Sequence, residues 1–292
     1  MKRVLISGVT GYIGSHLARI MLPDYEIYGL VKVPLHTEYI ADIQEKLHFV
    51  ETEGSYESIQ AALQKVRPDL VYHLAAYYTG AHGARETPKL IASNITFGAY
   101  LLEAMAECGI KTLVFASTVM AHYMNEPYLP LNLYAATKQA FSDLLAYYTD
   151  AGILRAATLI LSDTYGPGDH RPKILNQVKR AAITGEALAF SDGGQEYDVV
   201  HIDDAVRAFR MAGEGLLANE TWKNEIFQVF SQHPLTLRQT VEQMVALRNL
   251  TLNAEWGKRP QPEREIRKAV RLYPAVPGWK PEVELRDGLS HF

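Results

Sequence analysis

A tyrosine and a lysine stand four residues apart near the start of a predicted long helix, downstream of two adjacent hydroxyl residues. At this spacing Tyr134 and Lys138 share one face of the helix. A free tyrosine has a pKa of about 10 and is a poor acid–base catalyst near neutrality, but a neighbouring ammonium lowers that pKa. Thr118, with Ser117 as the adjacent alternative, can donate a hydrogen bond to a carbonyl oxygen. These residue types predict proton transfer at a substrate oxygen.

A tyrosine–lysine pair alone does not establish this chemistry, because such pairs occur by chance on many helices. Three glycines near the N-terminus give it independent support. In "VLISGVTGYIGSHLAR", Gly8 permits a tight turn, Gly11 lets the backbone approach a pyrophosphate, and Gly14 permits close helix–strand packing. The following helix offers free N–H groups to phosphates. An ordinary glycine-rich loop is the alternative, but the strand–turn–helix context favours a dinucleotide site. Hydride would then pass between a nicotinamide and a carbinol carbon.

The elements that must position these residues alternate along the first half of the chain. Apolar, strand-like runs occur near 3–8, 26–33, 47–50, 69–76, 111–118 and 154–161, and helix-like segments near 12–21, 56–66, 94–109 and 134–152. This alternation predicts an α/β fold with a doubly wound parallel sheet. We expect a dinucleotide-binding Rossmann domain over 1–165, with a return segment at about 196–216. Residues 166–292 should mainly form a smaller substrate-binding lobe.

Composition and charge exclude several classes of protein. The chain has 292 residues, of which 48% are hydrophobic and 21% charged, so it can bury a large core. A net charge of −4 points neither to nucleic acid nor to an anionic membrane surface. The single cysteine, Cys108, excludes an internal disulfide, and we predict no metal site. No apolar run approaches a membrane span, and we expect a cytoplasmic protein.

Several motifs in order resemble the extended branch of the short-chain dehydrogenase/reductase superfamily, which contains nucleotide-sugar epimerases, dehydratases and reductases. They are the G-x-x-G-x-x-G turn, "DLVYHLAA", Asn94, "YAATK", "TYGPGD", "DVVHIDDAVRAF" and "PGWKPEVELRDGL". The resemblance covers nearly the whole chain. It implies that Thr118, Tyr134 and Lys138 are catalytic, and that Lys138 also anchors the nicotinamide ribose. It implies cofactor contacts from Gly8, Thr10, Gly11, Tyr12, Ile13, Gly14, Lys32, Leu74, Ala75, Ala76, Asn94, Ser117, Tyr134 and Lys138.

The residue after the second predicted strand bears on the choice of cofactor. NAD-binding folds place a carboxylate there for the ribose 2′-hydroxyl, whereas this chain has Lys32 between two valines. A lysine would hold a 2′-phosphate, and Arg19 on the first helix could help. The sequence therefore favours NADP(H), with NAD(H) possible if Lys32 is only a solvated surface residue.

Departures from the family pattern narrow the reaction. Val119 and Met120 follow Thr118, where sugar 4,6-dehydratases carry an Asp–Glu pair, so dehydration is not expected. Asp163 replaces a common asparagine, and Tyr197 replaces an arginine that often supports the nucleotide phosphates. The candidate replacements are Arg171, Lys173 and Lys179 after "GPGD", and Arg264 or Arg267 near the C-terminus. The candidate substrate residues are Tyr78, Thr79, His82, Thr118, Asp163, Arg171 and Lys173.

The overall pattern is similar to the CDP-abequose and CDP-paratose synthase type of nucleotide-sugar 4-ketoreductase. We therefore expect NADPH-dependent reduction of a nucleotide-linked 4-keto sugar. A nucleotide-sugar epimerase that uses bound NAD is one alternative, and a non-catalytic protein that senses or binds the cofactor is another. Family members often dimerise through two long helices, here about 94–108 and 134–150, so a homodimer is expected.

Overall fold

A computed structural model describes all 292 residues, and its centre is a seven-stranded parallel sheet. The strand order is β11-β6-β5-β4-β1-β2-β3. The chain runs outward from β1 through β2 to β3 and then returns to place β4 beside β1, so the order reverses between β1 and β4. Ligands of such sheets bind at this reversal, outside the carboxyl ends of the strands. The strands are β1 (Lys2–Ser7), β2 (Tyr25–Val31), β3 (His48–Glu51), β4 (Leu70–His73), β5 (Thr112–Thr118), β6 (Arg155–Leu161) and β11 (Asn224–Val229).

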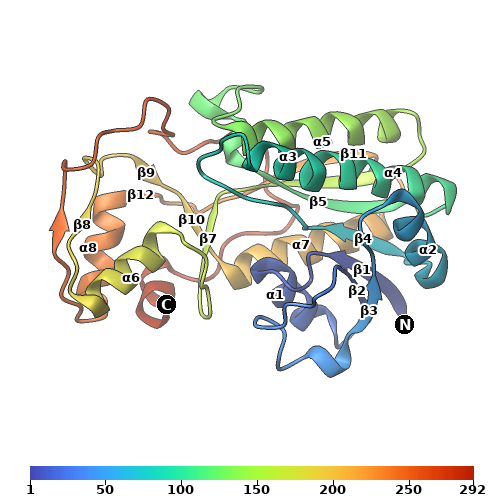
Figure 1. Ribbon diagram of the computed structural model, residues 1–292, viewed down its shortest axis with the longest axis horizontal. Helices are drawn as coiled ribbons and strands as arrows, with labels where there is room; N and C mark the ends of the chain where they lie inside the picture. Colours follow the sequence, from blue (N-terminus) through green and yellow to red (C-terminus); the bar gives the residue numbers. More distant parts are fainter.

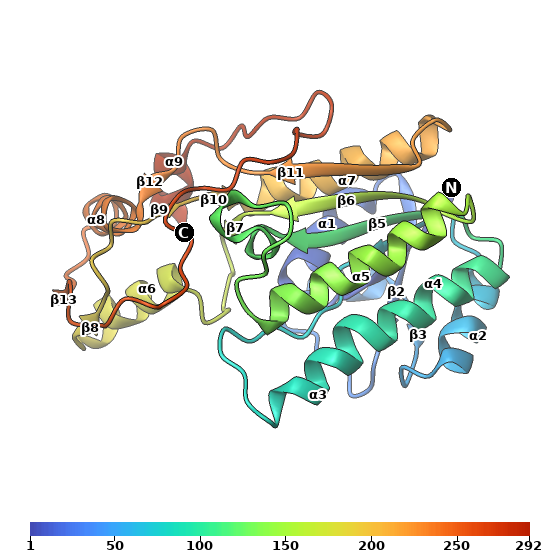
Figure 2. The ribbon, with the colours of Figure 1, turned by 90° about the horizontal axis from the view of Figure 1, so that it is seen from above.

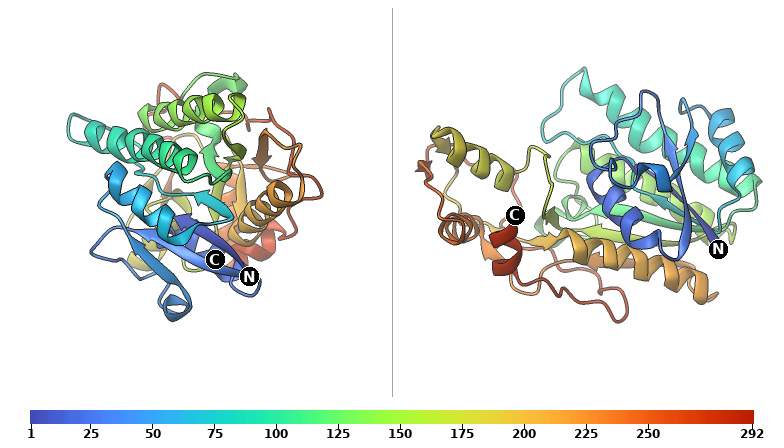
Figure 3. Two further views of the ribbon diagram at one scale, coloured as in Figure 1. Left: turned by 90° about the vertical axis from the view of Figure 1, so that its right-hand side faces the viewer. Right: turned by 90° about the horizontal axis from the view of Figure 1, so that it is seen from below.

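Helices cover both faces of the sheet (Figures 1 and 3). On one face lie α1 (Tyr12–Met21) and α7 (Ile202–Ala218), and on the other lie α2 (Tyr56–Val66), α4 (Phe97–Glu107) and α5 (Leu133–Asp150). A short helix α3 (Glu86–Ile91) continues through a π-helical turn, Ala92–Thr96, into α4. Each face has its own apolar core, because the helices bury one stripe of aliphatic residues against the strands.

A smaller lobe lies beyond the carboxyl ends of the strands, at the end of the molecule away from the N-terminus (Figures 1 and 2). It has a separate core that includes Phe190, Val241 and Met244. A parallel pair, β7 (Asp163–Tyr165) and β10 (Val199–His201), stands between sheet and lobe. The remaining elements are α6 (Ile174–Thr184), α8 (Leu237–Leu247), α9 (Leu285–His291), β8 (Leu188–Ala189), β9 (Glu196–Tyr197), β12 (Leu235–Thr236) and β13 (Ala254–Glu255).

The predicted α/β class and doubly wound sheet are confirmed. The segment that returns to the sheet after the start of the lobe is longer than the predicted one. Helix α7 extends to Ala218, and β11 pairs with β6 at the sheet edge although it lies outside the expected return segment of 196–216. The side chain and backbone of Gln228 on β11 hold the later segment 270–274, donating to Val270 O at 2.6 Å and Pro274 O at 2.8 Å. No helix is both long and apolar enough to cross a membrane.

Candidate active site

The glycine turn between β1 and α1, residues 8–14, forms a backbone cradle, and side chains at its glycines would collide with neighbouring backbone atoms. Gly8 has φ +81°, and a Cβ there would lie 2.7 Å from Ala75 N. A Cβ on Gly14 would lie 2.1 Å from Gly8 O. No side chain caps the N-terminus of α1, so its first N–H groups stay free for an anion. These features fit a dinucleotide pyrophosphate, and the turn contains the predicted residues Thr10, Gly11, Tyr12 and Ile13.

The segment after β4 passes directly over this turn. Leu74 N donates to Ser7 O at 3.1 Å, and Ala75 N donates to Ser7 Oγ at 3.4 Å. Thus Leu74, Ala75 and Ala76 lie beside the cradle. His73 is buried, and its Nδ1 is 2.8 Å from Ser7 Oγ. Burial and the nearby Lys138 lower the pKa of His73 to about 3, so it is a neutral core residue.

At the carboxyl ends of β2 and β3, Lys32 borders an open hollow of about 490 Å³. The lysine is exposed and forms no ion pair, so its charge is available to a ligand. The hollow is lined by Lys32, Val33, Glu51, Thr52, Glu53 and Ser58. The sequence suggested that Arg19 could help to hold a 2′-phosphate, but its Nη2 donates instead to Asp42 Oδ1 and Tyr39 O, each at 2.5 Å.

The three predicted catalytic residues meet at the carboxyl edge of the sheet. Thr118 ends β5 and accepts a hydrogen bond from Met120 N at 3.2 Å, which leaves its hydroxyl proton free to be donated. Tyr134 lies in the first turn of α5, where Asn132 caps the helix by accepting from Ala135 N at 2.9 Å. Lys138 lies one helical turn further and is buried. Ser117, which precedes Thr118, is buried at 4% exposure.

Burial controls the protonation of this group. It raises the pKa of Tyr134 above its ordinary value, the phenol of Tyr78 raises it further, and Arg171 lowers it only in part. The Tyr78 ring lies edge-on to Tyr134 with 4.9 Å between centroids. Lys138 is not among the groups that shift the pKa of Tyr134, so the chain by itself does not supply the lowering that the sequence predicts. Tyr134 is protonated at neutral pH, the form that can donate a proton.

Lys138 has no carboxylate partner. Its Nζ lies 4.2 Å from the centroid of the Phe115 ring, and burial lowers its pKa from 10.5 to about 7. An unpaired ammonium in this position is costly. Hydroxyl groups of a ligand in the cleft would supply the hydrogen bonds that the chain itself does not give to Lys138.

Asn94, which the sequence resemblance predicts as a cofactor contact, connects two segments of the site through its side chain. It lies in the π-helical turn and is buried, and its Oδ1 accepts from Tyr77 N at 2.8 Å. Its Nδ2 donates to Tyr77 O and Thr137 Oγ1, both at 3.0 Å. Thr137 donates in turn to Tyr134 O at 2.7 Å. This chain of bonds ties the segment after β4 to the catalytic turn of α5.

Among the predicted substrate residues, Tyr78 packs against Tyr134 and Asp163 lies within electrostatic range of Tyr78, whereas Thr79 and His82 lie in the loop after β4. Tyr78 is half exposed beside Tyr134. Burial and then the charge of Asp163 raise its pKa, so the carboxylate lies within electrostatic range. Thr79 donates to Ala81 O within its own loop. His82 is exposed, and no hydrogen bond or ion pair holds it.

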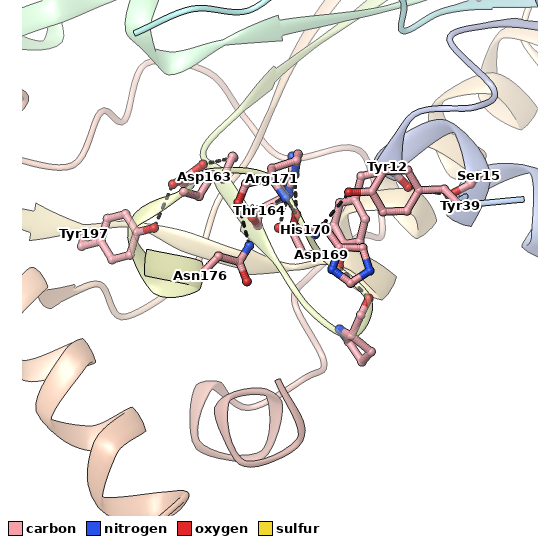
Figure 4. Close-up of polar contacts among 12 residues, drawn as sticks. Tyr12, Ser15, Tyr39, Asp163, Thr164, Asp169, His170, Arg171, Asn176 and Tyr197 are labelled. Carbon is pink, nitrogen blue, oxygen red and sulfur yellow. Dashed lines mark hydrogen bonds and ion pairs between the residues drawn. The ribbon is translucent and has the colours of Figure 1, made fainter. Parts of the chain in front are cut away.

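Two of the cations predicted to hold a diphosphate, Lys173 and Arg171, are each paired with a carboxylate of this chain, and Figure 4 shows Arg171 beside Asp169. Lys173 forms an ion pair with Asp163, whose other oxygen accepts from Tyr197 OH at 2.8 Å. Arg171 binds Asp169 at 2.6 and 2.8 Å and lies 4.4 Å from the centroid of the Tyr12 ring. The sequence showed the charges but could not show these pairings, because the partners come from different turns of one irregular segment.

Comparison with known proteins agrees with this geometry. The model of the NAD dependent epimerase/dehydratase family matches residues 4–228. The chain belongs to this family. It is 27% identical to CDP-abequose synthase of Yersinia pseudotuberculosis, over 82% of each chain. It is 26% identical to UDP-glucuronate 4-epimerase of Thermodesulfobacterium geofontis, over 99% of this chain and 94% of that one.

A solved structure shares the fold. It is the complex of Thermus thermophilus UDP-glucose 4-epimerase with NAD, with a TM-score of 0.83, 23% identity, and coverage of 99% of this chain and 97% of the other. Family membership together with the intact Thr118, Tyr134 and Lys138 makes the protein an NAD(P)-dependent enzyme of the extended short-chain dehydrogenase/reductase type.

Proposed function

We propose that this protein reduces the 4-keto group of a nucleotide-linked sugar or deoxysugar with NADPH. The observation that carries the proposal is a protonated Tyr134 in the first turn of α5, at the same sheet edge as Thr118, with no carboxylate on the residues directly after Thr118. Dehydration of a sugar needs an acid and a base beside the hydroxyl residue, and Val119 and Met120 supply neither. The similarity to CDP-abequose synthase supports the substrate class.

The residues of the chain have separate tasks in this reaction. Thr118 donates a hydrogen bond to the carbonyl oxygen and orients it toward Tyr134. NADPH supplies the hydride when it is bound. Tyr134 gives its hydroxyl proton to the same oxygen, so the ketone becomes an alcohol. Lys138 binds hydroxyl groups in the cleft and, when charged, stabilises the phenolate that Tyr134 leaves behind.

The test is net consumption of NADPH with a nucleotide-linked 4-keto-6-deoxysugar. We expect steady loss of NADPH absorbance and formation of one alcohol for each NADPH consumed. Tyr134→Phe should lose about 10²–10⁴-fold in turnover, because the proton donor is gone, while NADPH binding stays nearly unchanged. Tyr147→Phe, an exposed tyrosine further along the same helix, is the matched control. Undiminished turnover in Tyr134→Phe would refute the assignment.

The preference for NADPH rests on Lys32 at the end of β2. We expect NADPH to bind more tightly than NADH, and Lys32→Ala to weaken NADPH binding by about tenfold, which corresponds to about 1.4 kcal/mol for one charge-assisted contact. NADH binding should not change in that variant. Lys65→Ala, an exposed lysine on α2, is the control. Fluorescence titration with both cofactors measures this, and tighter binding of NADH by the wild type contradicts it.

Epimerisation with retained NAD is the second candidate, because relatives along nearly the whole chain include a UDP-glucuronate 4-epimerase. The two reactions differ in whether the cofactor is consumed. An epimerase interconverts two sugars without net change in NAD, whereas the reductase oxidises one NADPH for each alcohol formed. Incubation of the purified protein with UDP-glucose alone therefore separates them, since only the epimerase forms a second sugar.

A further inference from the structure

A partly exposed carboxylate lies near the carboxyl edge of the sheet, beyond the strand that pairs with the Thr118 strand. Leu161 on β6 is the register partner of Thr118 on β5, and Asp163 follows two residues later, about 7 Å further along the strand direction. Its side chain is 28% exposed and that of Lys173 is 24% exposed. Asp163 is therefore only partly buried, and it lies within electrostatic range of Tyr78, whose ring packs edge-on against Tyr134. Figure 4 shows its contacts with Tyr197 and the neighbouring segment.

The chemistry of this position differs from that of an amide. An asparagine side chain both donates and accepts hydrogen bonds, whereas an ionised carboxylate only accepts. Asp163 is ionised, because Lys173 and Tyr197 lower its pKa by more than burial raises it. Lys173 and Tyr197 each occupy one oxygen, and a carboxylate has about four acceptor positions. The chain gives these two oxygens no further partner, so an acceptor position is left for a ligand group that donates a hydrogen bond.

We propose that Asp163 selects a neutral sugar, whose hydroxyl donates to this carboxylate, and rejects a sugar that carries a carboxylate at that position. The inference rests on the proposed function, since it names the sugar class for the same site. The carboxylate of a uronate would face the carboxylate of Asp163. Both groups only accept hydrogen bonds, and their like charges repel.

The neighbouring cations do not offset the repulsion between a uronate and Asp163. Lys173 is already bound to Asp163, and a uronate that took Lys173 would leave Asp163 unpaired in a mostly buried place, which is costly. Arg171 is held by Asp169 and by Thr164 O at 3.0 Å. The remaining groups that face the carboxylate, Tyr197 and Tyr78, are phenols. The cluster has no uncommitted positive charge for a second carboxylate.

The experiment measures binding, not turnover. Calorimetry compares glucose and glucuronic acid, each linked to UDP and to CDP, on the NADP⁺-loaded protein. The wild type should bind the glucose derivative at least about tenfold more tightly. Asp163→Asn keeps the size of the side chain but adds a donor and frees Lys173, so the preference should fall to within about twofold or reverse. Asp192→Asn, whose carboxylate pairs with Arg267 on the lobe surface, is the matched control and should keep the preference.

A second variant keeps the inference open to refutation if Asp163→Asn folds poorly. Lys173→Gln removes the cation and leaves the carboxylate, so discrimination against the uronate should grow. Equal binding of the two sugars by the wild type, or an unchanged preference in Asp163→Asn, overturns the role of Asp163. Failure of both sugars to bind overturns that role and the nucleotide-sugar substrate together. A preserved preference without NADPH oxidation on keto sugars contradicts only the reductase activity.

Discussion

Lys138 carries a charge that the folded chain accommodates poorly. Burial lowers its pKa from the ordinary 10.5 to about 7, and no carboxylate offsets this. An unfolded lysine keeps its proton up to about pH 10, so between about pH 7 and that value the unfolded state binds more protons than the folded state. The free energy of unfolding must therefore rise with pH through this window.

The lysine predicts a specific pH dependence of stability. Lys138→Met should be more stable than the wild type at about pH 7, because the buried charge is removed. The difference should shrink by up to about 1.4 kcal/mol for each pH unit toward about pH 10, as the wild-type lysine releases its proton. Urea unfolding of both proteins across this range measures it, and Lys65→Met on the exposed side of α2 is the control. A difference that does not vary with pH contradicts the argument.

The sequence could identify candidate catalytic residues but not their protonation. Tyr134 and Lys138 were found from their spacing, because four residues make one helical turn. The pKa values depend on burial and on Tyr78, which reaches Tyr134 from a segment 56 residues earlier in the chain. In the same way, the partners of Lys173 and Arg171 depend on the path of an irregular segment, which has no periodicity from which to predict contacts.

At the scale of elements, the fit of α1 against β1 depends on Gly14. Gly14→Ala would put a Cβ 2.1 Å from Gly8 O, a contact with backbone that only a shift of the helix can relieve. We expect a loss of about 1–3 kcal/mol in stability and at least about tenfold in cofactor affinity, because the N–H groups at the helix start move away from the pyrophosphate. Gly80→Ala is the control, since the nearest atom to its Cβ is 3.7 Å away. Cofactor titration that finds equal loss in both variants rules out this explanation.

Elements with strong local patterns were predictable, and those held by distant partners were not. Helix α2 begins and ends at the predicted residues, because Ser55 caps it and Arg67 adopts a left-handed conformation before Pro68. Strand β11 was missed, because its six residues become a strand only by pairing with β6. The π-helical turn at Asn94 was likewise invisible, since the sequence there continues a helical pattern.

At the scale of the whole molecule, one helical face retains exposed aromatic side chains. Helices α4 and α5 lie side by side on the sheet (Figure 2). Most of the apolar residues of α5, such as Phe141 and Leu145, belong to the core. Tyr147 on α5 and Tyr100 on α4 are 66% and 38% exposed. This is the face through which the sequence resemblance predicts a homodimer.

The dimer is tested by the mass of the protein in solution. Sedimentation equilibrium should give about twice the chain mass of 32.7 kDa. Tyr147→Glu should weaken association by at least about tenfold, because it places a charge in an interface that favours aromatic side chains. Ile183→Glu on α6, where the side chain is 75% exposed on the lobe, is the matched control and should leave the dimer intact. A wild type that sediments as single chains, or a Tyr147→Glu variant that still pairs as tightly, removes this face from the assembly and leaves the site to work within one chain.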